Sequence, residues 1–382
     1  MRGCALSLTT NIINSIPFLH IHASQPSFSF PSQSLTIHNP TLKPLPSTSL
    51  SIHYHHHHPV HAQQHQSQLH HDNDEEEEES FQILTSVKTD YNDIMIVDTP
   101  NSRMLLLDSS HNVHSILYKE RKWTNSYWDE FASLPAIVPE GPIAILGLGG
   151  GTAAHLMLEL WPSLQLEGWE IDDILIDKAR DYFGLSDLEK TTEDGGILNV
   201  HIGDVFVPSE DLHGRYAGIV VDLFSDGKVL PQLQEVSTWL ELRDRLMANG
   251  RFMVNCGGID ASSSVAFASS DPGNLSNDEA WLLNAAMKAL SKAFPGEVSF
   301  SFWFFIISHN ILCDFLNVIL EEVQSVFAFS QLSWKRMPKE TGENFMALTG
   351  ALPDLKSWSA NVPSPLSTGV MDWRPCGMVS RI

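Results

Sequence analysis

The stretch that decides the fold runs from Ile143 to Thr152 and reads IAILGLGGGT. Its apolar start predicts a buried strand that ends in a glycine loop, and the following AAHLMLEL predicts a helix over 153–160. The next apolar run, LQLEGWEI, predicts a second strand that carries Glu170 at its tip. In such a β-α-β unit, a carboxylate at this position can accept hydrogen bonds from both hydroxyls of a ribose. We therefore expect a site for a nucleoside-containing ligand.

Strands and helices alternate beyond this unit. The expected strands are 143–146, 164–169, 198–202, 216–221 and 251–255, and the expected helices are 153–160, 173–182, 231–247 and 278–293. This alternation predicts an α/β fold with a doubly wound parallel sheet, in which ligands bind beyond the carboxyl ends of the strands. Three consecutive strand tips carry acids, namely Glu170, Asp204 and Asp222. We expect all three on the rim that holds the glycine loop.

A smaller unit is expected ahead of this sheet. Three short apolar runs between Phe81 and Asp108 predict a small antiparallel sheet, and a helix capped by Asn125 is expected over 125–134. The expected division is a small N-terminal β-domain at 81–122, a Rossmann-like domain at 123–352 and a C-terminal tail at 353–382.

The first 80 residues differ in composition from the rest. Residues 1–71 contain no Asp or Glu, only two basic residues and many Ser and Thr, which is typical of an organelle transit peptide, in a plant context a plastid one. A disordered tail without an address is the alternative. Nine of the 18 histidines fall within 53–71, in low-complexity sequence that predicts disorder. Seven acids in 72–80 predict a solvated linker.

The overall charge and the cysteines exclude some functions. The formal net charge of −23 opposes binding to nucleic acid or to an anionic membrane surface, and it suits a cationic substrate. The four cysteines form no CxxC pair, so the sequence predicts neither a disulfide framework nor a zinc site. No metal cofactor is expected.

The segment Phe300–Ser333 does not fit the alternating pattern. It is rich in Phe, Ile and Leu, but polar residues interrupt a membrane span over 300–320, and no single apolar stripe supports a core helix. The preferred hypothesis is an insertion within one strand, similar to translated noncoding sequence such as a retained intron. Its excision joins GEVS to WKRM, which with ENFMALTG would form a closing β-hairpin.

Two ligand classes compete for the glycine loop. Dinucleotide-binding loops place glycines at the first, third and sixth positions, and counting from Gly147 the sixth position is Thr152. The spacing of Gly147, Gly149, Gly150 and Gly151 is nearer to that of S-adenosylmethionine (AdoMet)-type transferases. One tip carboxylate could then serve the ribose and the other the adenine amino group.

The motifs ILGLGGGTAA, GWEIDDILIDKAR, LNVHIGD, VVDLFSDGKVLP and GRFMVN resemble the spermidine synthase family of polyamine aminopropyltransferases. The resemblance is to a plant, plastid-directed branch of the class I AdoMet-dependent transferases. It implies a seven-stranded Rossmann-like sheet, a small N-terminal β-domain that assists dimerisation, and thus a homodimer. It also implies decarboxylated AdoMet or AdoMet as co-substrate, a small-molecule amine as acceptor, and a place in polyamine biosynthesis.

The resemblance assigns roles to individual residues. Glu170 would hold the ribose, Asp204 the adenine amine, and Ile171 would lie against the adenine face. Asp222 falls where the family keeps its principal catalytic carboxylate, and Tyr127 matches a tyrosine that contacts the amine. An amine is protonated near neutral pH, so a carboxylate must orient it and help to remove a proton before it attacks.

Three departures from the family pattern stand beside this match. Thr152 replaces the aspartate of the family loop, and Ser133 replaces a family histidine. The second acid of the catalytic loop would be Asp226, four residues after Asp222 instead of three. The expected function is aminopropyl transfer to a di- or polyamine. The alternatives are methyl transfer from AdoMet to a small acceptor, and a catalytically silent nucleoside-binding or partner protein.

Overall fold

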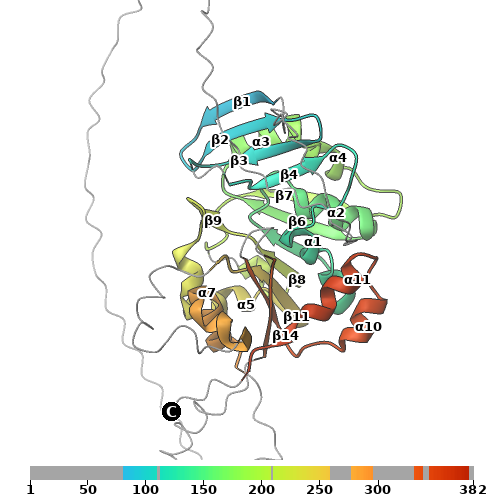
Figure 1. Ribbon diagram of the computed structural model, residues 1–382, viewed down its shortest axis with the longest axis vertical. Helices are drawn as coiled ribbons and strands as arrows, with labels where there is room; N and C mark the ends of the chain where they lie inside the picture. Colours follow the sequence, from blue (N-terminus) through green and yellow to red (C-terminus); the bar gives the residue numbers. More distant parts are fainter. Residues whose placement is uncertain are drawn as a thin grey trace, which may run out of the picture. The chain divides into compact units, whose positions relative to one another are not determined.

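The computed structural model describes residues 81–109, 112–207, 210–258, 277–295, 331–338 and 344–377. These residues form a four-stranded antiparallel sheet followed by an eight-stranded sheet with helices on both faces (Figure 1). The predicted transit peptide, His-rich segment and acidic linker lie outside the described residues, as do residues 300–330 of the proposed insertion.

The N-terminal sheet has strand order β1-β2-β3-β4. Its strands are β1 (Gln82–Lys88), β2 (Asp93–Asp98), β3 (Ser102–Leu106) and β4 (Ser115–Tyr118). The three apolar runs predicted from the sequence are therefore confirmed as strands. The fourth strand was not predicted, because its four residues (SILY) are flanked by His, Lys and Arg and show no long apolar run.

The large sheet has the order β14-β12-β13-β11-β8-β5-β6-β7. Its members are β5 (Ile143–Leu146), β6 (Gln165–Glu170), β7 (Ile197–Ile202), β8 (Tyr216–Val221), β11 (Leu246–Asn255), β12 (Leu332–Arg336), β13 (Phe345–Thr349) and β14 (Arg374–Pro375). The strands from β11 through β7 are parallel, and β13 runs against them. This confirms the predicted doubly wound α/β fold, with β14 as an eighth strand. The chain order reverses between β5 and β8, so the ligand crevice is expected at that point.

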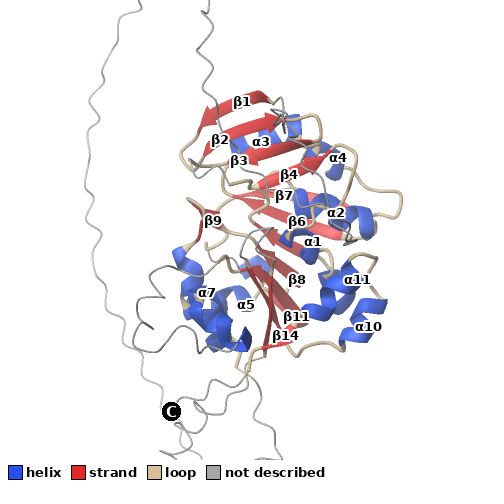
Figure 2. Cartoon of the chain, in the orientation of Figure 1, coloured by secondary structure: helices blue, strands red, loops and turns tan. Residues whose placement is uncertain are grey.

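Alternate side chains of the central strands enter two separate cores. On one face, Ile143, Ile145 and Val220 pack with α1 (Tyr127–Phe131), α2 (Thr152–Leu160), α3 (Asp173–Tyr182), α10 (Leu355–Ala360) and α11 (Leu366–Gly369). On the other, Ala144 and Ile219 pack with η3 (Pro231–Gln234), α5 (Val236–Arg243) and α7 (Ala285–Ala293) (Figure 2). All six residues of β8 are buried, as expected for a strand covered on both faces.

Short elements complete the described chain. They are α4 (Leu185–Leu188), the hairpin β9 (Phe224–Ser225) and β10 (Lys228–Val229), and the 3₁₀ helices η1 (Leu134–Ile137), η2 (Glu210–Leu212), η5 (Asn277–Leu283) and η7 (Val370–Asp372). The β9–β10 hairpin lies over the end of β11, since a Cβ at Gly257 would come within 2.9 Å of Val229.

Three helix predictions were wrong in their bounds. The predicted helix 231–247 is broken at Glu235, which is extended, and Leu246 begins β11 by pairing with Tyr216. The predicted helix 278–293 is divided at Asn284, whose side chain caps α7 by accepting from Met287 N at 3.0 Å. Helix α1 begins at Tyr127 and not at Asn125, because Asn125 adopts a left-handed φ of 58°.

The predicted C-terminal tail belongs to the folded domain over its described residues. Trp358, Val370 and Trp373 are buried, and the indole N–H of Trp358 donates to Ser133 O at 3.0 Å. Strand β14 also pairs with β12 at the sheet edge. The sequence prediction missed this because the segment has many prolines and serines and only short apolar runs.

The closing hairpin predicted beside the insertion is confirmed, since β12 pairs with β13 from Leu332 to Arg336. Leu332 and Ser333, the last two residues of the proposed insertion, are buried residues of this hairpin. Gln331 N donates to Phe294 O at 3.1 Å, so the chain on either side of residues 295–330 returns to the same place. In the part of the chain that the structure describes, there is no helix with the length and apolarity that a membrane span requires.

A buried ion pair joins the first helix to the sheet edge. Lys335 Nζ donates to Glu130 Oε1 at 2.6 Å and to Gly369 O at 2.8 Å, and both charged side chains are less than a tenth exposed. We expect Lys335→Met to lower the free energy of unfolding by about 3 to 5 kcal/mol, because it leaves a buried carboxylate without its cation. Urea denaturation measures this. The double variant Lys335→Met with Glu130→Gln should recover part of the loss; equal losses would contradict the pairing argument.

Candidate nucleoside and transfer site

The tips of four neighbouring parallel strands form one continuous rim. Backbone hydrogen bonds tie each tip to the next: Gly203 N donates to Glu170 O at 2.8 Å, Gly147 N to Trp169 O at 3.0 Å, and Asp222 N to Leu146 O at 2.9 Å. The predicted acids and the glycine loop therefore lie side by side along the carboxyl edge of β7, β6, β5 and β8.

The N–H groups of the glycine loop are already bonded within the protein. Those of Gly147 and Leu148 donate to Trp169 O, Gly149 N donates to Glu170 Oε2, Gly150 N to Ser115 Oγ, and Gly151 N to Leu148 O, all between 2.8 and 3.1 Å. A dinucleotide site instead points such N–H groups at a diphosphate. The loop geometry therefore favours a nucleoside without phosphates over a dinucleotide.

The glycines serve close approach to other parts of the protein. Gly147 has a φ of +86°, and a Cβ there would stand 2.3 Å from the carbonyl oxygen of Asp222. At Gly150, a Cβ would stand 2.8 Å from Cβ of Ser115. The loop thus brings β8 and β4 against the start of α2, which places the tip of Asp222 next to the loop.

Glu170 is held by three backbone donors. Its Oε2 accepts from Gly149 N at 3.1 Å, and its Oε1 accepts from Ile171 N at 2.9 Å and from Asp172 N at 3.3 Å. Burial raises the pKa of this carboxyl above its usual value, although the three N–H groups oppose the rise. A carboxylate has about four acceptor positions, and the three backbone N–H groups occupy three of them. Glu170 can therefore still accept a hydrogen bond from a ribose hydroxyl.

Ile171 and Asp204 lie on the same rim and face solvent. Ile171 is 37% exposed, so it is accessible at the rim. Asp204 is exposed, and its Oδ1 accepts from Phe206 N at 2.9 Å. The neighbouring Ile202 is 49% exposed, so an apolar surface borders the carboxylate. The roles of these two residues toward adenine remain predictions.

Asp222 is the centre of a second set of contacts. Asn255 Nδ2 donates to Asp222 Oδ1 at 3.0 Å, and the polar groups of Tyr127 and Trp128 lie close enough to this carboxyl to favour its charged form. Asn255 Oδ1 in turn accepts from Gly257 N at 3.0 Å, which fixes the orientation of its amide. The amide of Asn255 on β11 therefore orients the carboxylate at the tip of β8, and Tyr127 and Trp128 of α1 lie beside it.

Burial changes the ionisation of this set. It raises the pKa of Asp222 to about 6, because desolvation outweighs the hydrogen bond from Asn255 and the nearby polar groups of Tyr127 and Trp128, which favour the charged form. Burial and the nearby Asp222 charge also raise the pKa of Tyr127 well above its ordinary value, so its hydroxyl keeps its proton. Asp222 is thus ionised near neutral pH but basic enough to accept a proton.

The structure does not bring every predicted residue into these contacts. Asp226 is exposed at the turn of the β9–β10 hairpin with a φ of 50°, so the geometry gives no support to its predicted role as a second catalytic acid. Thr152 Oγ1 accepts from Ile116 N at 2.8 Å and donates to Ile116 O at 3.0 Å, which commits it to β4. Ser133 is fully buried and donates to Glu130 O.

Sequence reasoning missed three residues of the site. Trp128 and Asn255 contact Asp222, and Ser115 holds the glycine loop. Asn255 had a signal, since it is a polar residue at the end of the apolar strand GRFMVN, at the same rim as the other tips. Ser115 had none, because its strand was not predicted.

Comparison with known proteins gives the following picture. No family model matches the chain. It is 28% identical over 184 residues to a probable polyamine aminopropyl transferase of Bifidobacterium longum (47% of this chain, 39% of that protein). It is 25% identical over 182 residues to a polyamine aminopropyltransferase of Vibrio vulnificus (45% and 58%). The chain is similar to polyamine aminopropyltransferases. It spans less than two thirds of the length of either relative.

Solved structures with a similar arrangement include a probable spermidine synthase from Corynebacterium glutamicum. The TM-score is 0.43 at 13% identity, covering 70% of this chain and 79% of the other. A spermidine synthase from Thermotoga maritima gives a TM-score of 0.42 at 14% identity, covering 70% and 72%.

Proposed function

We propose that the chain transfers an aminopropyl group from decarboxylated AdoMet to a small di- or polyamine. The main support for the proposal is that two features lie on one rim of the sheet. The first is the expected nucleoside-binding site, formed by Glu170 and the glycine loop, and the second is the oriented carboxylate of Asp222. The sequence similarity to named aminopropyltransferases supports the same reaction. A single basic carboxylate beside a nucleoside suits a reaction that joins a sulfonium nucleoside to an amine.

The chemistry requires one proton acceptor and good alignment. The amine nitrogen attacks the propyl carbon attached to sulfur, a C–N bond forms, and the C–S bond breaks with its electron pair on sulfur. The sulfonium becomes a neutral thioether, methylthioadenosine, and the attacking nitrogen loses one proton. Asp222 can orient the protonated amine and accept that proton, while Asn255 holds the carboxylate in place and Tyr127 lies beside it. Since attack discharges the sulfonium, alignment contributes more than stabilisation of new charge.

Methyl transfer from intact AdoMet is the second candidate, and one observation favours it. The aspartate that contacts the aminopropyl amine in the resembled family is replaced by Thr152, whose hydroxyl is bonded at both its donor and acceptor to Ile116. Without that acid, recognition of an aminopropyl ammonium has fewer charged partners in the described part of the site.

Product analysis separates the candidates. The full-length protein is incubated with putrescine or spermidine and either decarboxylated AdoMet or AdoMet, and the products are read by mass spectrometry. We expect methylthioadenosine and an amine longer by one aminopropyl group, with decarboxylated AdoMet only. S-adenosylhomocysteine and a methylated amine from AdoMet would establish the methyl reading. Binding without turnover of either co-substrate would indicate a silent nucleoside-binding protein.

We also propose that the protein is directed to plastids and acts as a homodimer. The composition of residues 1–71 supports the first proposal. The second is supported by β1, an edge strand that contains Ile83 and directly follows Phe81, both more than 40% exposed. Import into isolated chloroplasts tests the plastid proposal, and retention outside the organelle would contradict it. Sedimentation equilibrium tests the dimer proposal, and a monomer at micromolar concentration would contradict it.

A further inference from the structure

The helix α3 begins directly after the residues that grip the nucleoside. Glu170 Oε1 accepts from the N–H groups of Ile171 and Asp172, and Asp172 is the N-cap of α3, with its Oδ1 accepting from Leu175 N at 3.2 Å. The orientation of the Glu170 carboxylate is therefore tied to the first turn of α3. Whatever fixes this helix end also fixes the ribose acceptor.

The N-terminal sheet holds that helix end. Asp172 Oδ2 accepts from Thr89 Oγ1 at 2.6 Å and from Asn92 Nδ2 at 2.7 Å, and both donors come from the turn between β1 and β2. Asp172 is fully buried, at 0% exposed. A buried carboxylate needs such donors, because burial without them is strongly unfavourable.

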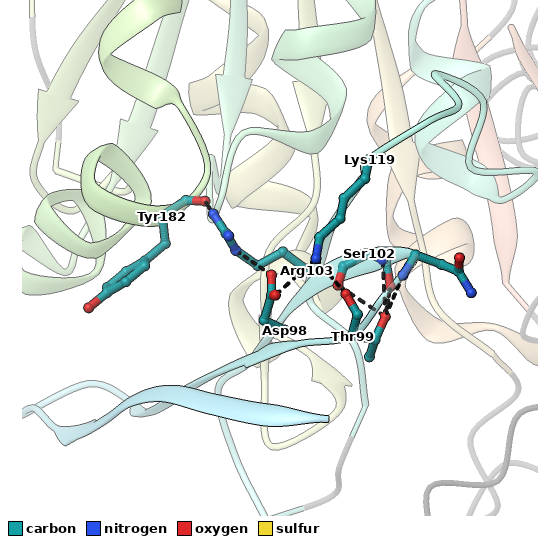
Figure 3. A network of polar contacts seen from close by, with 7 residues as sticks. Asp98, Thr99, Ser102, Arg103, Lys119 and Tyr182 are labelled. Atoms are coloured by element: carbon teal, nitrogen blue, oxygen red, sulfur yellow. Dashed lines mark hydrogen bonds and ion pairs between the residues drawn. The ribbon is translucent and has the colours of Figure 1, made fainter. Parts of the chain in front are cut away.

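The same sheet also holds the other end of α3. Figure 3 shows the Arg103 guanidinium of β3 donating to the main-chain carbonyl of Tyr182, the last residue of the helix. Arg103 Nε is oriented by Asp98 Oδ1 at 2.9 Å, and Lys119 Nζ contacts Asp98 Oδ2 at 2.9 Å. A cation at this end is favourable, since the free carbonyls of a helix C-terminus carry partial negative charge.

Both ends of α3 also make apolar contacts with the N-terminal sheet. Leu175 and Phe183, at the two ends of α3, form one buried cluster with Ile94, Ile96 and Leu105 of β2 and β3. The helix is therefore fixed to the N-terminal sheet at both ends, by polar contacts and by apolar packing.

We propose that the N-terminal sheet sets the affinity for the nucleoside by clamping α3, with Thr89 and Asn92 as positioning residues for Glu170. This inference rests on the nucleoside site of the proposed function. It assigns the sheet a role in ligand binding that does not depend on contact with the ligand. It also predicts that changes at the β1–β2 turn alter ligand affinity more than they alter stability.

A matched pair of threonines allows a sharp test. Thr89 and Thr99 make the same turn in successive hairpins: each N–H donates to the carbonyl three residues later, and each Oγ1 accepts from the N–H groups two and three residues later. Only Thr89 also reaches Asp172. Thr89→Val and Thr99→Val thus remove the same turn contacts. In addition, Thr89→Val removes the bond to α3, and Thr99→Val removes a 3.2 Å contact with Ser102 Oγ within its own turn.

The experiment measures the dissociation constant of methylthioadenosine by calorimetry, and the melting temperature, for full-length variants. We expect Thr89→Val to weaken binding about tenfold, within the usual range of coupling between linked elements, while Thr99→Val and Thr89→Ser bind like wild type. Asn92→Ala, which removes the second donor, is expected to act like Thr89→Val and replaces it if that variant does not fold.

A ligand without the ribose hydroxyls distinguishes positioning from a general loss of structure. The 2′,3′-dideoxy analogue of methylthioadenosine lacks the hydroxyls that Glu170 would accept, so its affinity should be nearly equal in wild type and Thr89→Val. The inference is overturned if wild type and Thr89→Val bind methylthioadenosine equally, or if Thr89→Val and Thr99→Val weaken binding equally. Either result leaves the proposed function in place. Absence of binding by the wild type overturns it together with the proposed function.

Discussion

Asp222→Asn is expected to lower kcat about a thousandfold, within the range of 10² to 10⁴ typical for removal of a general base, while the affinity for methylthioadenosine changes less than threefold. The amide keeps the shape of the side chain but cannot accept the proton of the attacking amine. The affinity is preserved because the nucleoside contacts assigned here lie on Glu170 and the loop, on neighbouring strand tips. Initial rates and calorimetry on the full-length variant measure the two quantities.

Asp226→Asn is the matched control. It makes the same chemical change four residues later, at an exposed hairpin turn where asparagine tolerates the positive φ of 50°. We expect its kcat to stay within about twofold of wild type, consistent with a position outside the contacts of Asp222. A large loss in Asp226→Asn with full activity in Asp222→Asn would reverse the assignment of the base.

The pH dependence follows from the same carboxyl. With a pKa of about 6, Asp222 is protonated below that pH, so kcat/KM should fall about tenfold per pH unit there and reach a plateau above pH 7. The pKa of Asp222 is higher in the folded protein, at about 6, than in the unfolded chain, at about 3.8. The protonated carboxyl therefore contributes its full stabilisation of the fold below about pH 3.8, and this stabilisation is lost as the pH rises through about 6. Asp222→Asn should therefore be more stable than wild type at pH 8, by at most about 3 kcal/mol. A wild-type rate that does not change between pH 5 and 8 would contradict the role of Asp222.

Glu170→Gln is expected to weaken methylthioadenosine binding about a hundredfold, or about 2.7 kcal/mol. Both carboxylate oxygens accept from backbone N–H groups, at Gly149 on one side and at Ile171 and Asp172 on the other. Whichever oxygen becomes the amide NH₂ then faces another donor, so the side chain must move away from the loop. The loss of charge also weakens bonds to the ribose hydroxyls. At saturating co-substrate, kcat should change little.

Glu159→Gln provides the control for this change. Glu159 is on α2, pairs with Lys122 at 2.7 Å and has a side chain that is half exposed. Its replacement should leave the dissociation constant unchanged. Binding by Glu170→Gln as tight as that of the control would remove Glu170 from the ribose site.

The sequence predicted the parts of the fold that depend on local pattern. Strands β5 and β8 have the predicted bounds, because apolar runs ended by glycine or an acid leave little freedom. The helix 231–247 was wrong because its apolar spacing was helical, whereas Leu246 is recruited into β11 by pairing with Tyr216. Such pairing connects residues 30 positions apart and is not visible in a local window.

The candidate site shows the same division. Each tip acid follows a recognisable strand, so Glu170, Asp204 and Asp222 were found, and backbone contacts place their strand tips together. The partners of Asp222 come from α1 and β11, far apart in sequence, so Trp128 and Asn255 could be found only in three dimensions. Thr152 looked like a lost ligand contact, and the structure shows instead that it joins the loop to β4.

The central claim is that this strand rim holds an adenosine carried by a sulfonium or thioether. Calorimetric titration of the full-length protein with methylthioadenosine, with decarboxylated AdoMet and AdoMet in parallel, tests it most directly. We expect saturable binding of methylthioadenosine with one site per chain, abolished when adenosine is replaced by inosine if Asp204 contacts the amino group. Absence of measurable binding for all three nucleosides at millimolar concentration would contradict the account.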